Sequence, residues 1–402
     1  MKKTVAYCSK NKLCCSCGFC FDICSKNAIK ILNKGGIFVP SINKDLCNKC
    51  GLCFDLCAGK GNDWYNQSIE LNTDIKDSYI QNVGIYREAY ISNALDYETR
   101  FHGASGGTVS SLLIFMLENK IIDGAIVTKF KKTNPLEVET IIATSKEEIL
   151  NAKSSKYCPV HMDSILTQLK EFKGKVAIVG LPCHLQTIRR IERKLSWVKD
   201  KIVFHIGLFC SGSKDSNALN YLLKSNNFDI NGITKFSYRD DGCLGYVKAE
   251  YTNKSISVPY EQAYSKLHSY FKPERCLSCI DHFAYLSDIS IGDIDCEPYC
   301  NDKIGSNSVI IRSVIAKDIF EEAIKNNVIQ AKIIPITEIV RSQRVLNYRN
   351  QTYKANKLLS KLLFKKNVEY DKILDTKLSF KGIKWVFSYK IQRMLRKFGL
   401  IK

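Results

Sequence analysis

The sequence predicts a small α+β module at the N-terminus, a larger α/β domain with a mixed sheet, and a helical basic tail. Ten of the 18 cysteines lie within the first 60 residues, whereas from residue 83 onward apolar runs alternate between strand and helix spacing. A chain of 402 residues is long enough for about two or three domains. We therefore expect domains at residues 1–70, 83–340 and 341–402.

Two cysteine runs of identical spacing dominate the N-terminal module, and both read C-x2-C-x2-C-x3-C. The runs are Cys14, Cys17, Cys20, Cys24 and Cys47, Cys50, Cys53, Cys57. In this pattern three thiolates of a run bind one 4Fe-4S cluster, and the fourth thiolate binds the other cluster. We therefore expect one cluster on Cys14, Cys17, Cys20 and Cys57, and a second cluster on Cys47, Cys50, Cys53 and Cys24.

Zinc is the alternative, because paired C-x2-C motifs also bind zinc. A zinc site gives no reason for the third and fourth cysteines to recur at the same spacing, so the pattern favours iron-sulfur clusters. Over residues 8–70 the chain resembles the bacterial two-cluster ferredoxin module, with a predicted hairpin of residues 28–32 and 36–40 between the runs. Ser25 and Ala58 stand where that module usually has proline, but no ligand is lost. Cys8 and Cys15 are interpreted as ordinary thiols.

The segment after the module alternates between strands and helices. The predicted strands are residues 88–92, 121–128, 139–144, 175–180, 202–209 and 288–293. The predicted helices are residues 107–118, one that begins at 144 or 145, 185–195 and one after Ser213. Strand 175–180, its following helix and strand 202–209 form a βαβ unit. Residues 236–238, 246–252 and 255–259 predict additional antiparallel pairing, so we expect a mixed sheet.

Two loops have the composition of a cofactor site. Residues 102–111 read HGASGGTVSS and place glycines and hydroxyls before an apolar helix. Free N–H groups at a helix start bind phosphate, and the absent side chains let a pyrophosphate or a ring approach. The alternative is a plain helix cap, because the G-x-G-x-x-G pattern of dinucleotide folds is missing. Residues 153–157 read KSSKY and offer cations, hydroxyls and an aromatic ring, with a solvated loop as the alternative.

A third set of cysteines is spread over the α/β domain. Cys183 follows strand 175–180, and Cys210 stands at the end of strand 202–209. Both therefore lie at the carboxyl edge of a parallel sheet, where ligands bind. Cys276 and Cys279 form a further C-x2-C pair, which completes a four-thiolate site for a third 4Fe-4S cluster. One alternative is that these cysteines fill core space. Another is that different cysteines compete as ligands, namely Cys158, Cys296 and Cys300.

Six segments occur in a fixed order: GASGGTVSSLL, SSKY, GLPCHLQ, HIGLFCSG, RCLSC and DISIGD. As an ordered set behind a two-cluster module, they resemble the coenzyme F420 hydrogenase/dehydrogenase beta-subunit family over residues 8–340. The resemblance implies an FAD-binding iron-sulfur domain that exchanges electrons with a hydride carrier such as coenzyme F420, and it supports the third cluster. It implies no particular substrate, because plant and cyanobacterial relatives instead reduce chlorophyll intermediates. The implied flavin contacts are Ser105, Gly106, Gly107, Thr108, Ser155, Lys156 and Tyr157.

The tail holds most of the charge. Residues 341–402 carry 17 Lys plus Arg against three acids, so +14 of the net charge of +20 lies there. Leucines at 358–363 and mixed aromatic and cationic residues at 384–399 predict amphipathic helices of the kind that lie on membrane surfaces. The alternatives are a helix packed on the core, contact with an acidic partner protein, and nonspecific binding to nucleic acid.

The sequence therefore predicts a cytoplasmic iron-sulfur flavoprotein oxidoreductase whose partner is a redox protein or a small hydride acceptor. Clusters move single electrons, and a flavin converts them to the two-electron steps of organic substrates. The N-terminus lacks the apolar block of a secretory signal, and no run reaches the ~20 apolar residues of a membrane span, so membrane contact would be peripheral. The alternatives are a non-catalytic electron-relay subunit of a larger redox complex and an iron-sulfur nucleic-acid-binding protein. No residue is singled out as catalytic; the candidate proton donors are His102, His184, His205, His268 and His282.

Overall fold

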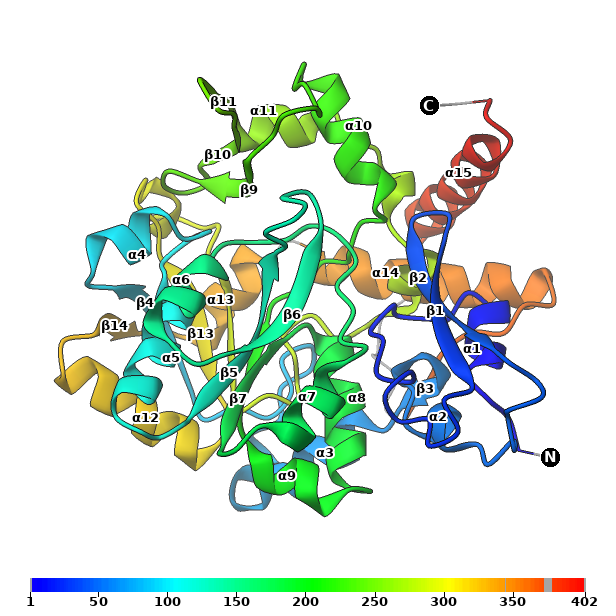
Figure 1. Cartoon of the computed structure of the whole chain (residues 1–402), viewed down its shortest axis with the longest axis horizontal. Helices are drawn as coiled ribbons and strands as arrows, with labels where there is room; N and C mark the ends of the chain where they lie inside the picture. Colours follow the sequence, from blue (N-terminus) through cyan, green and yellow to red (C-terminus); the bar gives the residue numbers. More distant parts are fainter. Residues whose placement is uncertain (1, 344, 372–377, 401–402) are drawn as a thin grey trace.

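An eight-stranded mixed sheet lies at the centre of the computed structural model, which describes residues 2–343, 345–371 and 378–400 (Figure 1). The strand order is β14-β4-β13-β12-β8-β7-β5-β6. The strands are β4 Glu88–Ala94, β5 Gly124–Phe130, β6 Val138–Ala143, β7 Val176–Gly180, β8 Ile202–Leu208, β12 Ile289–Asp293, β13 Asn307–Ile311 and β14 Ile329–Ile333. The predicted α/β class with a mixed sheet is confirmed.

The middle of the sheet is parallel, because β5, β7, β8 and β12 pair in the same direction. β13 runs antiparallel to both β12 and β4, so β4 points the same way as the parallel strands. The carboxyl ends of β4, β5, β7, β8 and β12 therefore meet at one edge of the sheet. Ligands of α/β proteins bind outside this edge, and the glycine loop after β4, Cys183 after β7 and Cys210 after β8 all lie there.

Helices cover both faces of the sheet. The helices of this region are α4 Tyr97–Phe101, α5 Thr108–Glu118, α6 Lys146–Asn151, α7 Ile165–Glu171, α8 Pro182–Glu192, α9 Ser196–Lys201, α12 Val314–Lys325 and α13 Ile336–Ser342. Helices α5, α6 and α12 bury apolar side chains against one face, and α7, α8 and α9 bury theirs against the other. Successive residues of a strand point to opposite faces, so Val127 belongs to the first core and Ile126 to the second. The fold is therefore a three-layer α/β/α arrangement.

The N-terminal segment lies beside the sheet, next to α8 (Figure 1). Its elements are α1 Ala6–Lys10, β1 Ile29–Lys34, β2 Ile37–Ile42, α2 Leu52–Asp55, η1 Ala58–Lys60, β3 Gly61–Asn62, α3 Trp64–Leu71 and η2 Thr73–Ser78. The predicted hairpin is confirmed, since β1 and β2 pair antiparallel from Ile29 to Ile42. Arg190 of α8 joins the segment to the sheet, because its guanidinium donates hydrogen bonds to the carbonyls of Cys57 (2.7 Å) and Gly61 (2.6 Å).

A small antiparallel sheet of β9, β10 and β11 stands above the carboxyl edge of the main sheet (Figure 1). It packs against two helices over a separate apolar core that includes Phe236 and Leu223. The elements here are α10 Asn217–Ser225, β9 Lys235–Asp240, β10 Tyr246–Glu250, β11 Ser255–Pro259 and α11 Tyr260–Ser265, followed by η3 Ser269–Phe271, η4 Glu274–Ser278 and η5 Tyr299–Asn301. The predicted additional antiparallel pairing is confirmed.

The basic tail packs against the rest of the chain. Its elements are α14 Val345–Leu362, β15 Glu369–Tyr370 and α15 Phe380–Lys397. β15 pairs with β3, and Arg396 of α15 forms an ion pair of 2.8 Å with the buried Asp215. Tyr389 and Val386 of α15 join Leu277 of η4 in a small apolar core. The tail therefore covers the C-x2-C loop of Cys276 and Cys279.

No helix in the described ranges combines the length and the apolar character needed to cross a bilayer.

A buried charge cluster ties β8 to α8. The His205 ring lies 2.6 Å from Glu192 and 3.0 Å from Asp288, and Arg189 pairs with both acids. Burial and Arg189 act to lower the pKa of His205, but Glu192 and Asp288 raise it above its usual value. His205 is 1% exposed, so it stabilises the fold and is not accessible to a substrate.

We expect His205→Gln to lower the free energy of unfolding by about 3 to 5 kcal/mol at pH 6, because two buried carboxylates lose the imidazolium and keep Arg189 as their remaining cation. A raised folded pKa means that the contribution of His205 is fully present below its unfolded pKa of about 6.5 and is lost as the pH rises through the folded value. Urea unfolding at pH 6 and pH 9 should show the difference from wild type shrinking at the higher pH. His268→Gln, at an exposed ring, should show a small difference at both pH values; a constant large difference for His205→Gln would contradict this account.

Candidate functional site

The two N-terminal cysteine runs follow the same backbone course. Ser16 and Lys49, each just before the second cysteine of a run, have φ of 60° and 56°, and Gly18 and Gly51, just after it, have φ of 82° and 84°. A left-handed backbone conformation is uncommon for residues other than glycine. Because it recurs at matching positions of both runs, the two runs share one type of turn. Turns of this kind aim backbone N–H groups into an anion-binding concavity.

One pocket is lined by Cys14, Cys17, Cys20 and Cys57, which are the four residues expected to share a cluster. The amides of Ser16 and Gly59 lie 3.4 Å and 3.2 Å from the sulfur atoms of Cys14 and Cys57 and donate to them. Burial raises the pKa of Cys20, and the thiols of Cys17 and Cys14 raise it further. A hydrogen bond from Cys8 instead lowers the pKa of Cys57. A metal that binds such a set displaces the protons that remain.

The second run lies nearer to solvent. Cys50 is exposed, while Cys24, Cys47 and Cys53 are partly buried. Burial raises the pKa of Cys53, the Val5 amide lowers it, and the thiols of Cys24 and Cys50 raise it again, so these thiols are close neighbours. The fourth cysteine of the first run therefore lies beside the second run, as the crossed ligand scheme requires.

A second pocket gathers the third set. Cys183 at the start of α8, Cys210 after β8, and Cys276 and Cys279 around the end of η4 all line it. The amide of Gly212 donates to the Cys210 sulfur at 3.4 Å. Burial, with Cys210 and Cys279 as neighbours, raises the pKa of Cys276 to about 11. The competing cysteines lie elsewhere: Cys158 packs in the core under β9 to β11, and Cys296 faces the Glu338 carbonyl.

Two buried arginines also line this second pocket. Arg275 and Arg349 are 4% and 5% exposed, and neither Nε atom has a hydrogen-bond partner within the described part of the chain. Burial acts to lower the pKa of Arg349, but the thiols of Cys279, Cys210 and Cys276 raise it. A buried cation without a counter-charge is costly. Four thiolates around an anionic iron-sulfur cluster would supply that charge, so these residues fit such a group.

Cys15 connects the two pockets. Both are lined by Cys14 and Cys15, so they adjoin each other. A hydrogen bond from Cys183 lowers the pKa of Cys15 to about 6; burial opposes this shift and Arg275 reinforces it. The sequence interpretation of Cys15 as an ordinary thiol therefore missed its position. Its partners Cys183 and Arg275 are 168 and 260 residues away along the chain, so local spacing in the sequence does not indicate these contacts.

The glycine loop lies at the same edge of the sheet. The Ser105 hydroxyl accepts a hydrogen bond of 2.5 Å from the Asn307 side-chain amide. The Thr108 backbone N–H donates to the Asn307 side-chain oxygen at 3.2 Å. Gly107 is the left-handed N-cap of α5. A Cβ atom at Gly106 would lie 2.8 Å from the Ser92 carbonyl, so this position accepts glycine alone without rearrangement.

The second predicted loop, residues 153–157, follows α6 and contacts β9. Ser154 donates to the Arg239 carbonyl, and Arg239 forms a 2.6 Å ion pair with Asp293 at the end of β12. Tyr157 packs on the rings of Tyr238, Tyr260 and Tyr264. Ser155 is partly buried. The Lys156 ammonium donates to the carbonyls of Ala152, Lys153 and Ser154, and burial lowers its pKa to about 7, so this side chain braces its own loop.

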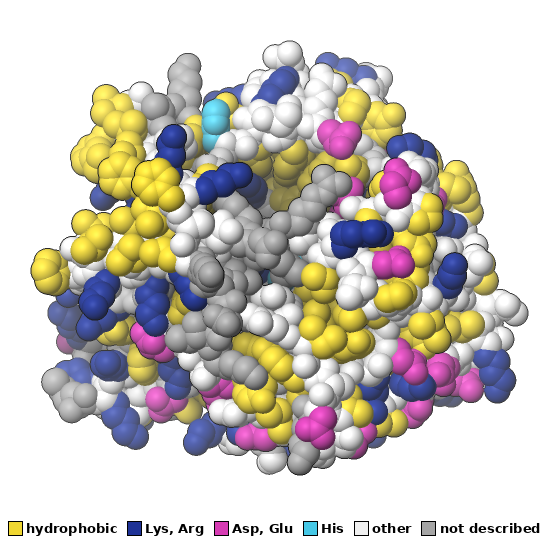
Figure 2. Space-filling view, turned by 180° about the vertical axis from the view of Figure 1, so that it is seen from behind, with side chains coloured by type: hydrophobic (Ala, Val, Ile, Leu, Met, Phe, Trp, Pro, Cys, Tyr) yellow, Lys and Arg dark blue, Asp and Glu magenta, His cyan; other side chains and the backbone are white. Residues whose placement is uncertain are grey.

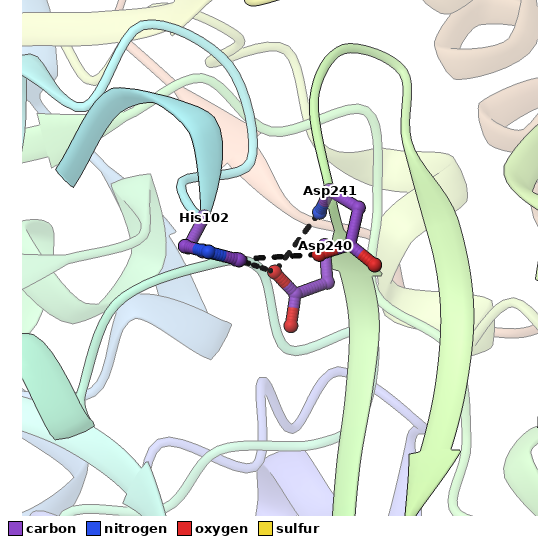
Figure 3. Close-up of side chains that lie close together, drawn as sticks. All are labelled: His102, Asp240 and Asp241. Atoms are coloured by element: carbon purple, nitrogen blue, oxygen red, sulfur yellow. Dashed lines mark hydrogen bonds and ion pairs between the residues drawn. The ribbon is translucent and has the colours of Figure 1, made fainter. Parts of the chain in front are cut away.

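His102 points toward two aspartates of the β9–β10 turn (Figure 3). Its ring nitrogen lies 2.7 Å from Asp240 and 3.3 Å from Asp241. One imidazole and two carboxylates at this separation are a donor set suited to a divalent cation. The aspartates are 138 and 139 residues from His102 in the sequence, which is why sequence reasoning named the histidine and missed its partners.

His184 and His282 are poorly suited to proton transfer near pH 7. Burial lowers the pKa of His184 to about 4. Burial and then Arg349 lower the pKa of His282 to about 3. Both rings are therefore neutral, and His184 lines the second pocket as an uncharged side chain.

Comparison with known proteins agrees with this arrangement. The beta subunit of coenzyme F420 hydrogenase from Methanosarcina barkeri is 26% identical over 271 residues, which are 66% of this chain and 86% of that protein. The coenzyme F420-dependent sulfite reductase of Methanocaldococcus jannaschii is 26% identical over 247 residues, 58% of this chain and 37% of that protein. The chain thus spans about a third of the reductase and most of the hydrogenase subunit.

A solved structure has the same fold. A chain of the F420-reducing [NiFe] hydrogenase complex from Methanosarcina barkeri superposes with a TM-score of 0.55 at 21% identity, over 72% of this chain and 97% of that chain. Residues 89–167 match the family model of the N-terminal part of the coenzyme F420 hydrogenase/dehydrogenase beta subunit, and residues 173–336 match the model of its C terminus. The chain belongs to the coenzyme F420 hydrogenase/dehydrogenase beta-subunit family.

Proposed function

We propose that this chain is a cytoplasmic iron-sulfur flavoprotein oxidoreductase. It passes electrons between 4Fe-4S clusters, FAD and a two-electron carrier such as coenzyme F420 or another small organic substrate. The main support is the convergence of cysteines from distant parts of the chain on two adjoining pockets. Relatives named as F420-linked hydrogenase and reductase subunits support the oxidoreductase class.

Each cofactor has a proposed set of residues. In the ferredoxin-like domain, residues 1–70, one cluster belongs to Cys14, Cys17, Cys20 and Cys57, and a second to Cys47, Cys50, Cys53 and Cys24. In the FAD-binding domain, residues 83–340, the third cluster belongs to Cys183, Cys210, Cys276 and Cys279. FAD belongs to the Ser105–Thr108 loop and to residues 155–157. Gly106 and Gly107 let the first loop pack closely against Ser92, Asn307 and Thr99. Because the Lys156 ammonium is occupied by carbonyls, its contribution is to hold the loop.

The clusters supply one-electron transfer and FAD supplies the conversion to two-electron chemistry. The chain itself orients the thiols, donates backbone N–H groups to sulfur and provides buried positive charge from Arg275 and Arg349. His102, whose ring nitrogen lies 2.7 Å from Asp240, places an imidazole at the start of the glycine loop.

The proposed partners are a redox protein or a small hydride carrier. We place the reaction in the cytoplasm because all 18 cysteines are free thiols, which a reducing compartment maintains. Residues 341–402 form the basic tail, whose contact with a membrane or an acidic protein is peripheral.

The deciding measurement is the content of iron, acid-labile sulfide and released flavin in protein purified without oxygen. Three clusters and a flavin predict about twelve irons and one FAD per chain. About eight irons with no flavin, even after FAD is added, would leave an electron-relay subunit. Zinc in place of iron would reject the proposal altogether.

We expect Cys276→Ser to remove about four irons per chain, because a serine hydroxyl is a poor substitute for a thiolate ligand. Cys158→Ser is the matched control, since that cysteine is also buried but lies outside both pockets, and it should leave the iron content unchanged. Equal iron content in Cys276→Ser and wild type would contradict the third site.

We expect Arg349→Gln to shift the midpoint potential of one cluster to a more negative value, because removing a nearby positive charge favours the oxidised form. Arg349→Lys keeps the charge and should restore most of the potential. A redox titration followed by electron paramagnetic resonance measures both variants, with iron content as the control for cluster loss. An unchanged potential in Arg349→Gln would show that this arginine has only a structural role.

A further inference from the structure

One face of α15 is apolar, and no element in the described part of the chain covers it. The opposite face is fixed to the protein, because Tyr389 and Val386 are buried and the Tyr389 hydroxyl donates to the Lys272 carbonyl at 2.6 Å. The Arg396–Asp215 ion pair holds the end of the helix in the same orientation. The large side chains left exposed on or next to α15 are Phe380 (82%), Phe387 (56%), Ile391 (38%), Met394 (52%), Phe398 (68%) and Leu400 (69%).

The spacing of these side chains makes them one stripe. Positions 380, 387, 391, 394 and 398 recur at intervals of seven, four, three and four residues, which is the period of one helix face. Leu400 continues the stripe beyond the end of the helix. Figure 2 shows hydrophobic side chains gathered at the upper left, where the 180° turn from Figure 1 brings α15, with Lys and Arg side chains beside them. The stripe lies on a projecting helix, so it is a ridge and not a groove.

The charges around the stripe are all positive. Residues 378–400 contain six Lys plus Arg and no Asp or Glu. Three of the cations, Lys390, Arg393 and Arg396, are used in contacts with Glu274, Tyr270 and Asp215. The other three, Lys381, Lys384 and Lys397, are exposed at the two ends of the stripe.

We propose that this face of α15 is a docking surface for an anionic lipid bilayer, with the apolar stripe inserted below the headgroups and the lysines at their level. An apolar ridge with flanking cations and no carboxylate is the pattern of an interfacial helix. A specific protein interface also uses about one hydrogen bond per 100–200 Å², and this face offers few polar groups for them. Double-stranded nucleic acid would attract the lysines, but its paired and stacked bases would gain nothing from Phe387 or Met394.

The surface belongs to the tail and lies beyond residue 336, where the family-model match ends. None of the exposed stripe residues lines either cysteine pocket. Binding to lipid is therefore independent of the proposed redox function, and either can fail without the other.

The test is flotation of the full-length, iron-loaded protein with vesicles of phosphatidylcholine alone or mixed with phosphatidylglycerol. We expect binding to the anionic vesicles only, and at least about tenfold weaker partitioning for Phe387→Ser combined with Met394→Ser, because two large apolar groups lose their burial. Ile333→Ser is the matched control, since Ile333 is 65% exposed on β14, and it should bind like wild type. In Phe387→Trp, tryptophan emission should shift to the blue on anionic vesicles.

Three results would overturn the proposal. The first is no flotation of the wild type with anionic vesicles. The second is flotation that the double serine variant leaves unchanged, which would mean attraction by charge alone. The third is that the wild type binds no vesicles and the double variant elutes from gel filtration as a smaller particle than the wild type. That result would assign the stripe to a contact with a second copy of the chain. Iron content in the same samples separates these outcomes from a failure of the clusters.

Discussion

Buried positive charge at the junction of three parts of the chain governs this structure. Arg190 comes from α8, Arg275 from η4 and Arg349 from α14, and all three are at least nine-tenths buried. Arg190 and Arg275 donate to the carbonyls of Cys57, Gly61 and Ala58, so they hold the N-terminal segment against the sheet. Asp63 also pairs with Arg190 at 3.4 Å. Carbonyl dipoles compensate a buried charge only in part, and thiols of the second pocket are groups near Arg275 and Arg349 that can become anions.

This charge balance explains why the tail packs where it does. Arg349 donates to the Asp281 carbonyl at 2.6 Å, and Tyr370 and Asn356 bind Ser278, so the tail closes over the loop that holds Cys276 and Cys279. α15 then covers η4 from outside. The Arg396–Asp215 pair, with Asp215 fully buried, holds α15 in this position. The outer face of the same helix remains free for a contact of another kind.

Local patterns in the sequence predicted many of the strands and helices. They did not predict site residues whose role depends on contacts with distant parts of the chain. The βαβ unit around residues 175–209 and the hairpin between the cysteine runs were predicted because periodicity and spacing are local properties. β13 was missed, since a short apolar run such as residues 307–311 has no periodicity that separates strand from buried helix. Arg275, Arg349, Asp240 and the position of Cys15 were missed because each acquires its role from a partner more than 65 residues away. Parallel strands were the exception, because their shared carboxyl edge allowed Cys183 and Cys210 to be placed together in advance.

The order of strands also relates the cysteine pockets to the glycine loop. Cys210 follows β8, Asp293 ends β12, and Asn307 begins β13, and these strands are consecutive in the sheet. Neighbouring strands lie about 4.8 Å apart, so Cys210 and the Asn307 that binds Ser105 are separated by roughly 10 Å along the edge. On the opposite side, the first pocket adjoins the second through Cys14 and Cys15, and Cys50 of the remaining set is exposed. The proposed function would use this order for one-electron exchange at the exposed cysteines and two-electron exchange at the glycine loop.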